Sequence, residues 1–563
     1  MKFKLKGEND YNDNPIEAIF RNRGVYNLEE LLNVDDTSII HHSLLVNIYE
    51  AADCLLKNIE NESKIFIQVD SDCDGFCSSA ILINYITKQF PNVQIEWRLH
   101  DGKQHGVDVE KVPEDVGLVI IPDAGTNQFE EHLKLKEKGI DVIVLDHHDS
   151  DKISEHAIVV NNQLSPEYRN KHFSGAGIAY KFCKALDEKL DTHLADYYLD
   201  LVAVGNIGDM MDLRELETRY YAKKGLSQIN NPLIKEIINK QDYSMGGIVN
   251  IHNTAFFVVP LINAAVRFAT LEEKINMMKS FLGHEEQVYY KRGDTYESLH
   301  VSVARNLTNI RNRQNKPKDK SIPVIEEYIL NENLIDEKVL IIDVSNILDK
   351  TLTGLVANQI ARKYRRPVLL LRAKENGVLG GSARGFEEGE VNDFKEFLQQ
   401  SKLFNLCEGH GNAFGVEINE ENIDKLKEYI KLNLKKEIEI DSYEVDFIIK
   451  GEKLSNNLVR NVGQYRDEWG SFISEPKIAI SSMEFNINDI QLYGKKKNML
   501  KMTYKGIEFV KPYFNEEKYN ELFKDGESFY INVLGKFKIN EWNGYKKPQV
   551  VIEEFKIEDV LLF

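Results

Sequence analysis

Three aspartates alternate in the segment VDSDCDGFCSS, at Asp70, Asp72 and Asp74. Carboxylates packed this closely repel one another and cost stability unless cations neutralise them. Divalent metal binding is the economical explanation of the segment. The alternative is a solvated Asp-rich turn, or an aspartate that caps the helix which follows.

Further acidic and histidine residues follow other apolar runs. IIPDAG supplies Asp123, and VAVGNIGDMMDL supplies Asp209. Between them, VIVLDHHDS supplies Asp146, His147 and His148. Carboxylate oxygens with one imidazole suit manganese or magnesium, and paired divalent ions suit displacement at phosphorus. The four segments therefore predict a site for two metal ions.

These side chains follow strands of an expected parallel sheet. From about Lys64 to Leu226 the apolar runs IFIQV, GLVIIP and DVIVLDHH alternate with amphipathic stretches, which is typical of a parallel α/β sheet. Ligands of open α/β sheets bind at the carboxyl ends of the strands. We therefore expect residues 70–74, Asp123 and residues 146–148 to surround one crevice.

The chain of 563 residues is longer than one hydrophobic core usually serves, so several domains are expected in an α/β protein. The polar run RNRQNKPKDK is interpreted as a linker. Short strands with interleaved aromatic and Lys residues near the C-terminus predict a small all-β barrel. The expected parts are an N-terminal segment at 1–60, a parallel-sheet domain at 61–229, a helical connector and linker at 230–330, a smaller α/β domain at 331–437 and the all-β domain at 438–563.

The formal net charge is −19, which argues against broad nucleic-acid binding through a basic surface. A carboxylate metal site contributes negative charge that bound cations offset, and a basic groove can lie on one domain of an acidic protein. The run GKKKNMLKMTYK holds five Lys residues and no acid. It is either such a local basic patch or a solvated hairpin.

Neither an apolar secretory signal nor an uninterrupted run of 18 apolar residues is visible, so we expect a cytoplasmic protein without a membrane partner. Five scattered cysteines favour reduced thiols over a disulfide framework. Cys73 and Cys77 lack a second Cys pair that would complete a zinc site. The five are Cys54, Cys73, Cys77, Cys183 and Cys407.

The order of the acidic motifs resembles the signature of DHH phosphoesterases. DSDCDG, PDAG, the DHH triplet at 146–148 and GNIGD follow one another as they do in that family. The resemblance implies a catalytic domain that binds two Mn²⁺ or Mg²⁺ ions. Gln68 stands where several members carry a metal-binding His, so weaker binding of the first ion is expected.

The resemblance also implies a role for each acidic or histidine residue. Asp72 and Asp123 would hold the first ion. Asp123 would bridge to the second ion, which Asp74, His147 and Asp209 would complete. His148 would face the scissile phosphate, with Asp70 and Asp146 supporting the metal ligands.

The segment VVPLINAAVR at 258–267 is similar to the P-R-x-N-A-x-G-R segment of RecJ exonucleases. Substrate contact by its Asn and Arg is what the similarity implies, and the alternative is an ordinary helix with one exposed Arg. The matching positions are Asn263, Ala264, Ala265 and Arg267, and the departures are Leu261 and Val266.

GGSARG and EGHGNAFG resemble the two signatures of the DHHA1 domain found in such proteins. The resemblance implies a 5′-phosphate grip at Ser382 and Arg384, and Gly backbone beside Ser and Arg suits close contact with phosphate oxygens. It implies substrate contact at Gly409 and His410. Glu408 stands where the family usually has Gly, and a Gly-rich turn is also common in any α/β domain.

The last 125 or so residues resemble the OB-fold domain of RecJ proteins, most clearly at GKFKINEWNGYKKPQVVIEEF. An OB barrel with aromatics and Lys offers a track for single-stranded nucleic acid through base stacking and phosphate contact. Trp542 and Tyr545 are candidate stacking residues, with Lys546 and Lys547 beside them. Alternatively, Trp542 belongs to the core.

Taken together, the resemblance implies a monomeric, metal-dependent 5′-to-3′ exonuclease that hydrolyses single-stranded DNA to 5′-mononucleotides in DNA repair or recombination. A helicase and a single-strand binding protein are its expected partners. One alternative is a DHH hydrolase of short oligoribonucleotides or signalling dinucleotides, whose members typically lack an OB domain. Another is a non-catalytic DNA-binding replication scaffold, in which the Asp and His motifs should be broken.

Overall fold

A computed structural model describes residues 1–100, 104–386, 389–435, 442–494, 497–523, 527–542 and 545–558. The chain forms two compact units. The smaller unit comprises Met1–Lys4 and Asn309–Glu444, and the larger unit comprises Leu5–Thr308 and Val445–Phe563. Each unit is described by itself.

A parallel sheet of five strands organises the first half of the larger unit, as the apolar runs predict. Its order is β3-β2-β4-β5-β6 and every neighbouring pair is parallel. The central strands are almost entirely buried, which explains their continuous apolar sequences. The strands are β2 (Lys64–Val69), β3 (Ile95–Leu99), β4 (Val116–Pro122), β5 (Asp141–Asp146) and β6 (Ile158–Asn161).

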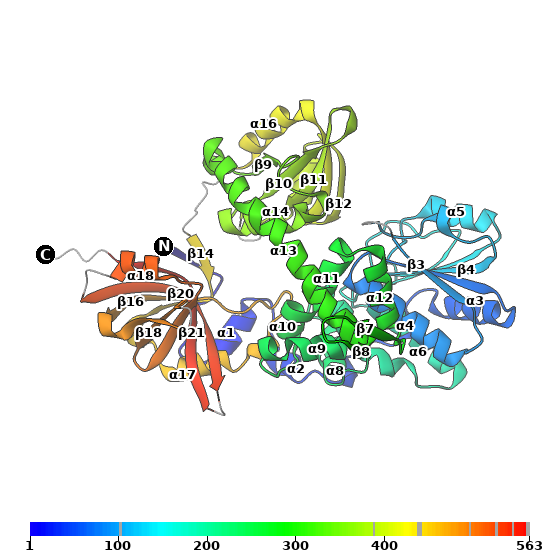
Figure 1. The fold of residues 1–563 in the computed structure, drawn as a ribbon, viewed down its shortest axis with the longest axis horizontal. Helices are drawn as coiled ribbons and strands as arrows, with labels where there is room; N and C mark the ends of the chain where they lie inside the picture. The colour runs from blue at the N-terminus through cyan, green and yellow to red at the C-terminus, as the bar shows by residue number, and fades with distance from the viewer. Residues whose placement is uncertain are drawn as a thin grey trace. The chain divides into compact units, whose positions relative to one another are not determined.

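Helices cover both faces of this sheet (Figure 1). α4 (Cys73–Gln89) and α6 (Gly175–Leu190) pack together on one face, and α5 (Phe129–Glu137) covers the other. α7 (Leu199–Gly208) packs against α4 and is followed by α8 (Leu216–Leu226). Parallel strands joined in this way bring their carboxyl ends to one edge. Cys73 and Cys77 are buried free thiols within α4.

The connector is helical, as expected, but its polar run is not a linker. Residues 311–320 lie inside the long helix α13 (Leu299–Asn331), which continues through Pro317 and Pro323. The linker prediction is wrong because the run continues one helix, which buried side chains anchor on either side of it, at Ile310 before and at Ile322, Ile325 and Ile329 after. The preceding helices are α9 (Pro232–Met245), α10 (Ile251–Asn253), the π-helix Thr254–Val258, α11 (Val259–Phe268) and α12 (Leu271–Phe281).

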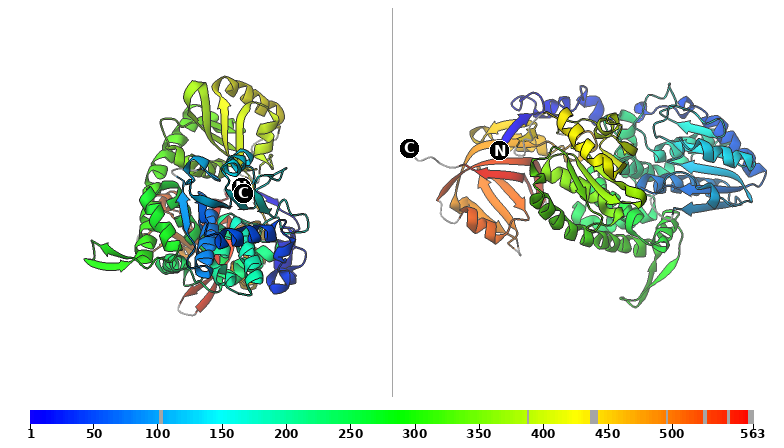
Figure 2. Two further views of the ribbon diagram at one scale, coloured as in Figure 1. Left: turned by 90° about the vertical axis from the view of Figure 1, so that its right-hand side faces the viewer. Right: turned by 90° about the horizontal axis from the view of Figure 1, so that it is seen from above.

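Two features of the connector were not expected from the sequence. The hairpin of β7 (Gln287–Tyr290) and β8 (Thr295–Ser298) interrupts the helices, and Figure 2 shows it extending away from them. Within the described residues, one stretch, Ile251–Phe268, is both long enough and apolar enough to cross a membrane. Half of it is buried inside the protein.

The smaller unit contains a five-stranded sheet of order β12-β13-β11-β10-β9, in which only β9 and β10 are parallel. The Gly-rich segment GVLGGSARG forms strand β11 of this sheet rather than a turn. A Cβ on Gly381 would lie 1.9 Å from the carbonyl oxygen of Leu370, so close strand packing accounts for that glycine. The strands are β9 (Leu340–Asp343), β10 (Val368–Ala373), β11 (Val378–Arg384), β12 (Phe404–His410) and β13 (Ala413–Asn419).

Three helices, α14 (Thr353–Tyr364), α15 (Phe394–Gln400) and α16 (Ile423–Asn433), accompany this sheet. In addition, β1 (Lys2–Leu5) pairs with β14 (Ser442–Val445). The N-terminus is therefore joined to the end of the smaller unit by strand pairing.

The C-terminal part is a seven-stranded sheet of order β15-β16-β20-β21-β19-β18-β17. This agrees with the all-β prediction, although α17 (Asn456–Gly463) and α18 (Glu516–Phe523) are added to it. The strands are β15 (Phe447–Lys450), β16 (Ile478–Asn486), β17 (Ile490–Tyr493), β18 (Met499–Tyr504), β19 (Ile507–Pro512), β20 (Ser528–Trp542) and β21 (Tyr545–Ile557).

The N-terminal segment, which the sequence left unassigned, packs against both parts of the larger unit. α1 (Pro15–Arg21) contacts α17, α2 (Leu28–Leu32) follows, and α3 (Ile48–Glu60) contacts α6. The guanidinium of Arg23 forms a buried ion pair with Asp446 and donates to the carbonyl of Ser474 at 2.9 Å. This pair fastens the N-terminal segment to the C-terminal sheet.

Replacing Arg23 by Ala should destabilise that junction strongly, because Asp446 would remain buried without its charge partner. We expect a loss of about 3–5 kcal/mol, measured as an earlier transition of Trp469 fluorescence in a urea titration. The matched control is Arg21→Ala, which removes an exposed pair with Glu8 and should cost less than about 1 kcal/mol. If the two variants unfolded at the same urea concentration, the assignment of Arg23 as the buried partner of Asp446 would be contradicted.

Candidate metal centre

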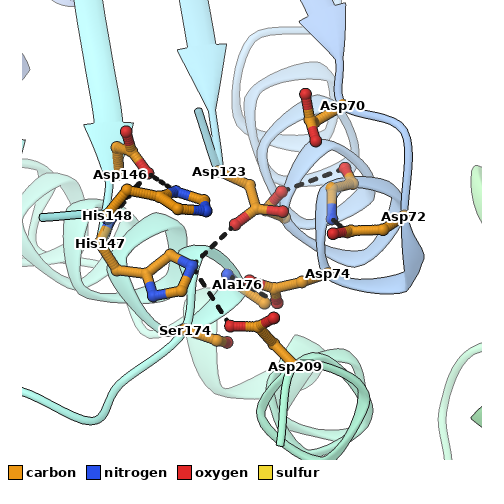
Figure 3. Close-up of polar contacts among 12 residues, drawn as sticks. Asp70, Asp72, Asp74, Asp123, Asp146, His147, His148, Ser174, Ala176 and Asp209 are labelled. Carbon is orange, nitrogen blue, oxygen red and sulfur yellow. Dashed lines mark hydrogen bonds and ion pairs between the residues drawn. The ribbon is translucent and has the colours of Figure 1, made fainter. Parts of the chain in front are cut away.

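The predicted metal ligands meet at the carboxyl edge of the parallel sheet (Figure 3). Residues 70–74 run from the end of β2 into the first turn of α4, Asp123 directly follows β4, and the DHH triplet begins at the last residue of β5. Asp209 arrives from a different direction, at the C-terminus of α7. The structure thus brings together every acidic and histidine side chain that the sequence singled out for this crevice.

Two sets of potential ligand atoms lie side by side. Within each set, one atom from every residue lies within 4.8 Å of the others. The Nε2 atom of His147 is 3.2 Å from Oδ1 of Asp123 and 3.4 Å from Oδ2 of Asp209, so Asp123 adjoins both sets. The first set is Asp70, Asp72 and Asp123, and the second is Asp74, His147 and Asp209.

Some carboxylate oxygens of this cluster have no hydrogen-bond donor in the described part of the chain. Among the described residues, Oδ2 of Asp74, Oδ1 of Asp123 and Oδ2 of Asp209 are buried and accept no hydrogen bond. Burial raises the pKa of Asp74 to about 6, and the charge of Asp72 adds to this. Burial, together with Asp74 and Asp72, raises the pKa values of Asp123 and Asp209 well above the ordinary value. Oxygen-rich sites of this kind fit hard divalent cations.

Glycine and backbone groups allow the carboxylates to pack this tightly. The amide of Ala176 donates to Oδ1 of Asp74 at 3.1 Å. A Cβ on Gly205 would lie 2.3 Å from Oδ1 of Asp74, and one on Gly175 would lie 2.4 Å from Oδ1 of Asp123. Sequence reasoning missed Gly175 and Ala176, for which the SGAG segment was the available signal.

The carboxylate of Asp146 stabilises the turn at residues 146–148 through hydrogen bonds to neighbouring groups. Its Oδ1 accepts from the amide of His147 at 2.7 Å and from Nδ1 of His148 at 2.7 Å, and its Oδ2 accepts from the amide of Thr126 at 3.0 Å. Burial opposes protonation of His148, but the charge and hydrogen bond of Asp146, together with the charges of Asp209 and Asp72, outweigh it and raise the pKa of His148 to about 10. His148 is therefore a partly exposed imidazolium at neutral pH, suited to an anionic ligand.

Asp70 has a partner that the sequence did not reveal. Its Oδ2 lies 2.8 Å from Nδ1 of His105, and its Oδ1 accepts from the amide of Gly106 at 3.1 Å. Gln68, noted for replacing a His, donates from Nε2 to the carbonyl of Arg98 on β3 at 3.0 Å. The side-chain nitrogen of Gln68 therefore forms a hydrogen bond within the sheet.

Of the α11 candidates, Asn263 is half-buried and Arg267 is exposed. Although the residue is exposed overall, surrounding protein atoms desolvate its guanidinium and lower the pKa of Arg267, and the charge of Asp72 opposes that effect. Arg267 is therefore a cation electrostatically coupled to the metal cluster.

The smaller unit brings two further candidates together. Oγ of Ser382 lies 3.1 Å from Oγ1 of Thr353, the first residue of α14. The Arg384 guanidinium lies so close to Gly354 that a Cβ there would approach it to 2.5 Å. Ser382 and Arg384 thus adjoin the positive end of a helix.

The remaining candidates lie on strands. Gly409 has a φ of +127° on β12, and the side chain of His410 lies outside the described residues. Tyr545, at the start of β21, is 75% exposed. The side chain of Trp542 lies outside the described residues, so the choice between core and stacking residue stays a prediction.

The raised carboxyl pKa values predict a pH-dependent response to Mn²⁺. A raised pKa means that protonation stabilises the metal-free fold at low pH, and that this contribution is lost as pH rises through about 6. Mn²⁺ should therefore raise Tm by about 5 °C or more near pH 8 and by clearly less near pH 5. Differential scanning fluorimetry checks this, and equal shifts at both pH values would contradict it. Asp74→Asn should reduce the difference between the Mn²⁺-induced Tm shifts at pH 8 and pH 5.

Comparisons with known proteins agree with this geometry. A family model described as the DHH family, N-terminal domain, matches residues 64–206, and one described as the RecJ OB domain matches residues 445–554. A protein of Bacillus subtilis strain 168 named "Putative SPbeta prophage-derived single-strand DNA-specific exonuclease YorK" is 45% identical over 99% of this chain and 98% of its own length.

More distant relatives extend the similarity. The single-stranded-DNA-specific exonuclease RecJ of Bacillus subtilis strain 168 is 25% identical over 91% of this chain and 64% of its own length. The crystal structure of RecJ from Thermus thermophilus in complex with Mn²⁺ superposes with a TM-score of 0.71 at 20% identity, covering 97% of this chain and 76% of that one. The chain therefore belongs to the RecJ-like exonucleases of the DHH family.

Proposed function

We propose that the protein hydrolyses single-stranded DNA from its 5′ end, releases 5′-mononucleotides, and requires two Mn²⁺ or Mg²⁺ ions. The observation that carries the proposal is the group of buried carboxylate oxygens on Asp74, Asp123 and Asp209 that accept no hydrogen bond among the described residues. Once ionised, such a group is costly unless cations lie beside it. The names of the 45% identical relative and of RecJ support DNA as the substrate.

Different residues would bind the metal ions and the scissile phosphate. Bound divalent ions lower the pKa of water and stabilise charge on the attacking and leaving oxygens. Asp72, Asp74, Asp123, His147 and Asp209 would hold these ions. The imidazolium of His148, fixed by Asp146, and the guanidinium of Arg267 would bind the oxygens of the scissile phosphate as charge-assisted donors.

The other parts of the chain would position the strand. Ser382 and Arg384, beside the N-terminus of α14, offer a hydroxyl, a guanidinium and helix amides to a terminal phosphate. Tyr545, exposed at the C-terminal sheet, would stack on a base farther along the strand. We further propose that the protein acts in DNA repair or recombination, and that it works with a helicase and a single-strand binding protein.

Asp123→Asn should lower the rate of mononucleotide release by about 10²–10³-fold or more, because it removes the carboxylate that belongs to the first ligand set and adjoins the second. The measurement is a time course with Mn²⁺ on single-stranded DNA labelled separately at each end. Immediate release of a labelled mononucleotide from the 5′ end alone supports the proposal. Turnover of dinucleotides without degradation of long strands would instead make the protein a small-substrate hydrolase.

Arg384→Ala tests the 5′-phosphate grip separately from the metal centre. Wild-type protein should favour a 5′-phosphorylated strand over a 5′-hydroxyl strand in kcat/KM, and the variant should lose about tenfold on the former only. Arg384→Lys should recover part of the preference. A loss of equal size on both strands would contradict the assignment.

A further inference from the structure

An aromatic residue occupies a backbone position that disfavours it, at a turn between the metal-binding part and the C-terminal sheet. Gly470 and Ile473 form a β-bridge that closes the turn Gly470-Ser471-Phe472-Ile473. Phe472, its third residue, has a φ of +61°. A turn with positive φ at this position alone favours Gly or Asn, and a bulky residue there is strained.

The turn is firmly held, so its conformation is imposed by its surroundings. Trp469 and Ile473 are buried, and Trp469 stacks on Phe20 with ring centroids 5.1 Å apart. The amide of Leu213 donates to the carbonyl of Ser471 at 3.4 Å. Phe472 itself is nevertheless 55% exposed, so its ring is not needed to fill the core.

Arg214 and His172 flank the exposed ring. The guanidinium carbon of Arg214 lies 5.3 Å from the Phe472 ring centroid, and the His172 ring lies 5.9 Å from it. Arg214 is fixed by Asp212, to which Nε donates at 2.9 and 3.0 Å, and by the carbonyl of Arg23 at 3.1 Å. The ring thus has a guanidinium and an imidazole beside it and is still partly open to solvent.

Both flanking residues are close along the chain to the metal centre. His172 is two residues before Ser174, whose amide donates to Asn206 of the GNIGD motif at 3.2 Å, and two residues span at most about 7 Å. Arg214 follows the metal-ligand candidate Asp209 by five residues. Two residues of chain therefore separate the aromatic platform, defined as Phe472, Arg214 and His172, from a segment that is hydrogen-bonded to the GNIGD motif.

We propose that the aromatic platform stacks on a base of the single-stranded substrate and holds the strand beside the metal centre. This inference rests on the proposed function and adds Phe472, which lies in the segment that matches the RecJ OB domain, to the candidate stacking residues. An exposed aromatic ring with a guanidinium against it suits the π-face of any base. A strained position is retained where the side chain serves function rather than folding.

Three substitutions separate stacking from packing. Phe472→Gly relieves the backbone strain and removes the ring, Phe472→Leu keeps apolar bulk without an aromatic face, and Phe472→Trp keeps the face. We expect the Gly and Leu variants to bind a short single-stranded oligonucleotide about tenfold more weakly in EDTA, while Trp stays near wild type. The Gly variant should have an unchanged or higher Tm. Tyr243→Ala, on an exposed aromatic of α9, is the control.

Oligonucleotides with one abasic residue at successive positions locate the stacked base. For the wild type, one position should weaken binding about tenfold, and Phe472→Gly should abolish that difference. Wild-type affinity in the Leu variant, or a lowered Tm of the Gly variant with unchanged affinity, would show that Phe472 serves packing and would overturn the inference. Wild-type protein that neither binds nor degrades single strands would overturn the proposed function itself.

Discussion

Repulsion among buried carboxylates is the constraint on which the rest of the structure depends. Asp74, Asp123 and Asp209 present oxygens without hydrogen-bond donors among the described residues, and desolvation makes their charges costly. Only a rigid scaffold can hold such groups together. The parallel sheet provides it by ending neighbouring strands at one edge, and α7 supplies the last carboxylate from another direction.

Buried ion pairs hold the remaining parts of the larger unit together. Arg23 and Asp446 are paired in the interior, and Arg219 of α8 pairs with Glu468. Buried pairs of this kind specify one arrangement more than they add stability, since desolvation offsets their attraction. The turn that presents Phe472 lies between Glu468, paired with Arg219, and Ser474, whose carbonyl accepts from Arg23, which explains how a strained residue is maintained there.

Much of the catalytic part could be predicted from the sequence because its signals are local. Continuous apolar runs marked β2, β4 and β5, and the residues directly after them were the metal-ligand candidates. What escaped prediction depends on packing between distant segments. His105 contacts Asp70 from a separate loop, Gly175 fits against Asp123 from α6, and residues 311–320 look like a linker until their buried neighbours are known.

In the smaller unit, too, contacts between distant segments could not be predicted from the sequence. Gly-rich sequence signalled a turn, yet Gly381 is required by the closeness of Leu370 on the next strand. Thr353 and Gly354 could not be linked to Ser382 and Arg384, because almost thirty residues separate them along the chain. Local sequence therefore identified the chemistry better than it identified the supporting contacts.

The central claim is that this carboxylate cluster holds two divalent ions. Anomalous diffraction at the manganese edge, from crystals grown with Mn²⁺, tests it directly. The account predicts one peak among Asp70, Asp72 and Asp123 and a second among Asp74, His147 and Asp209. Peaks elsewhere, with neither position occupied at saturating Mn²⁺, would contradict it.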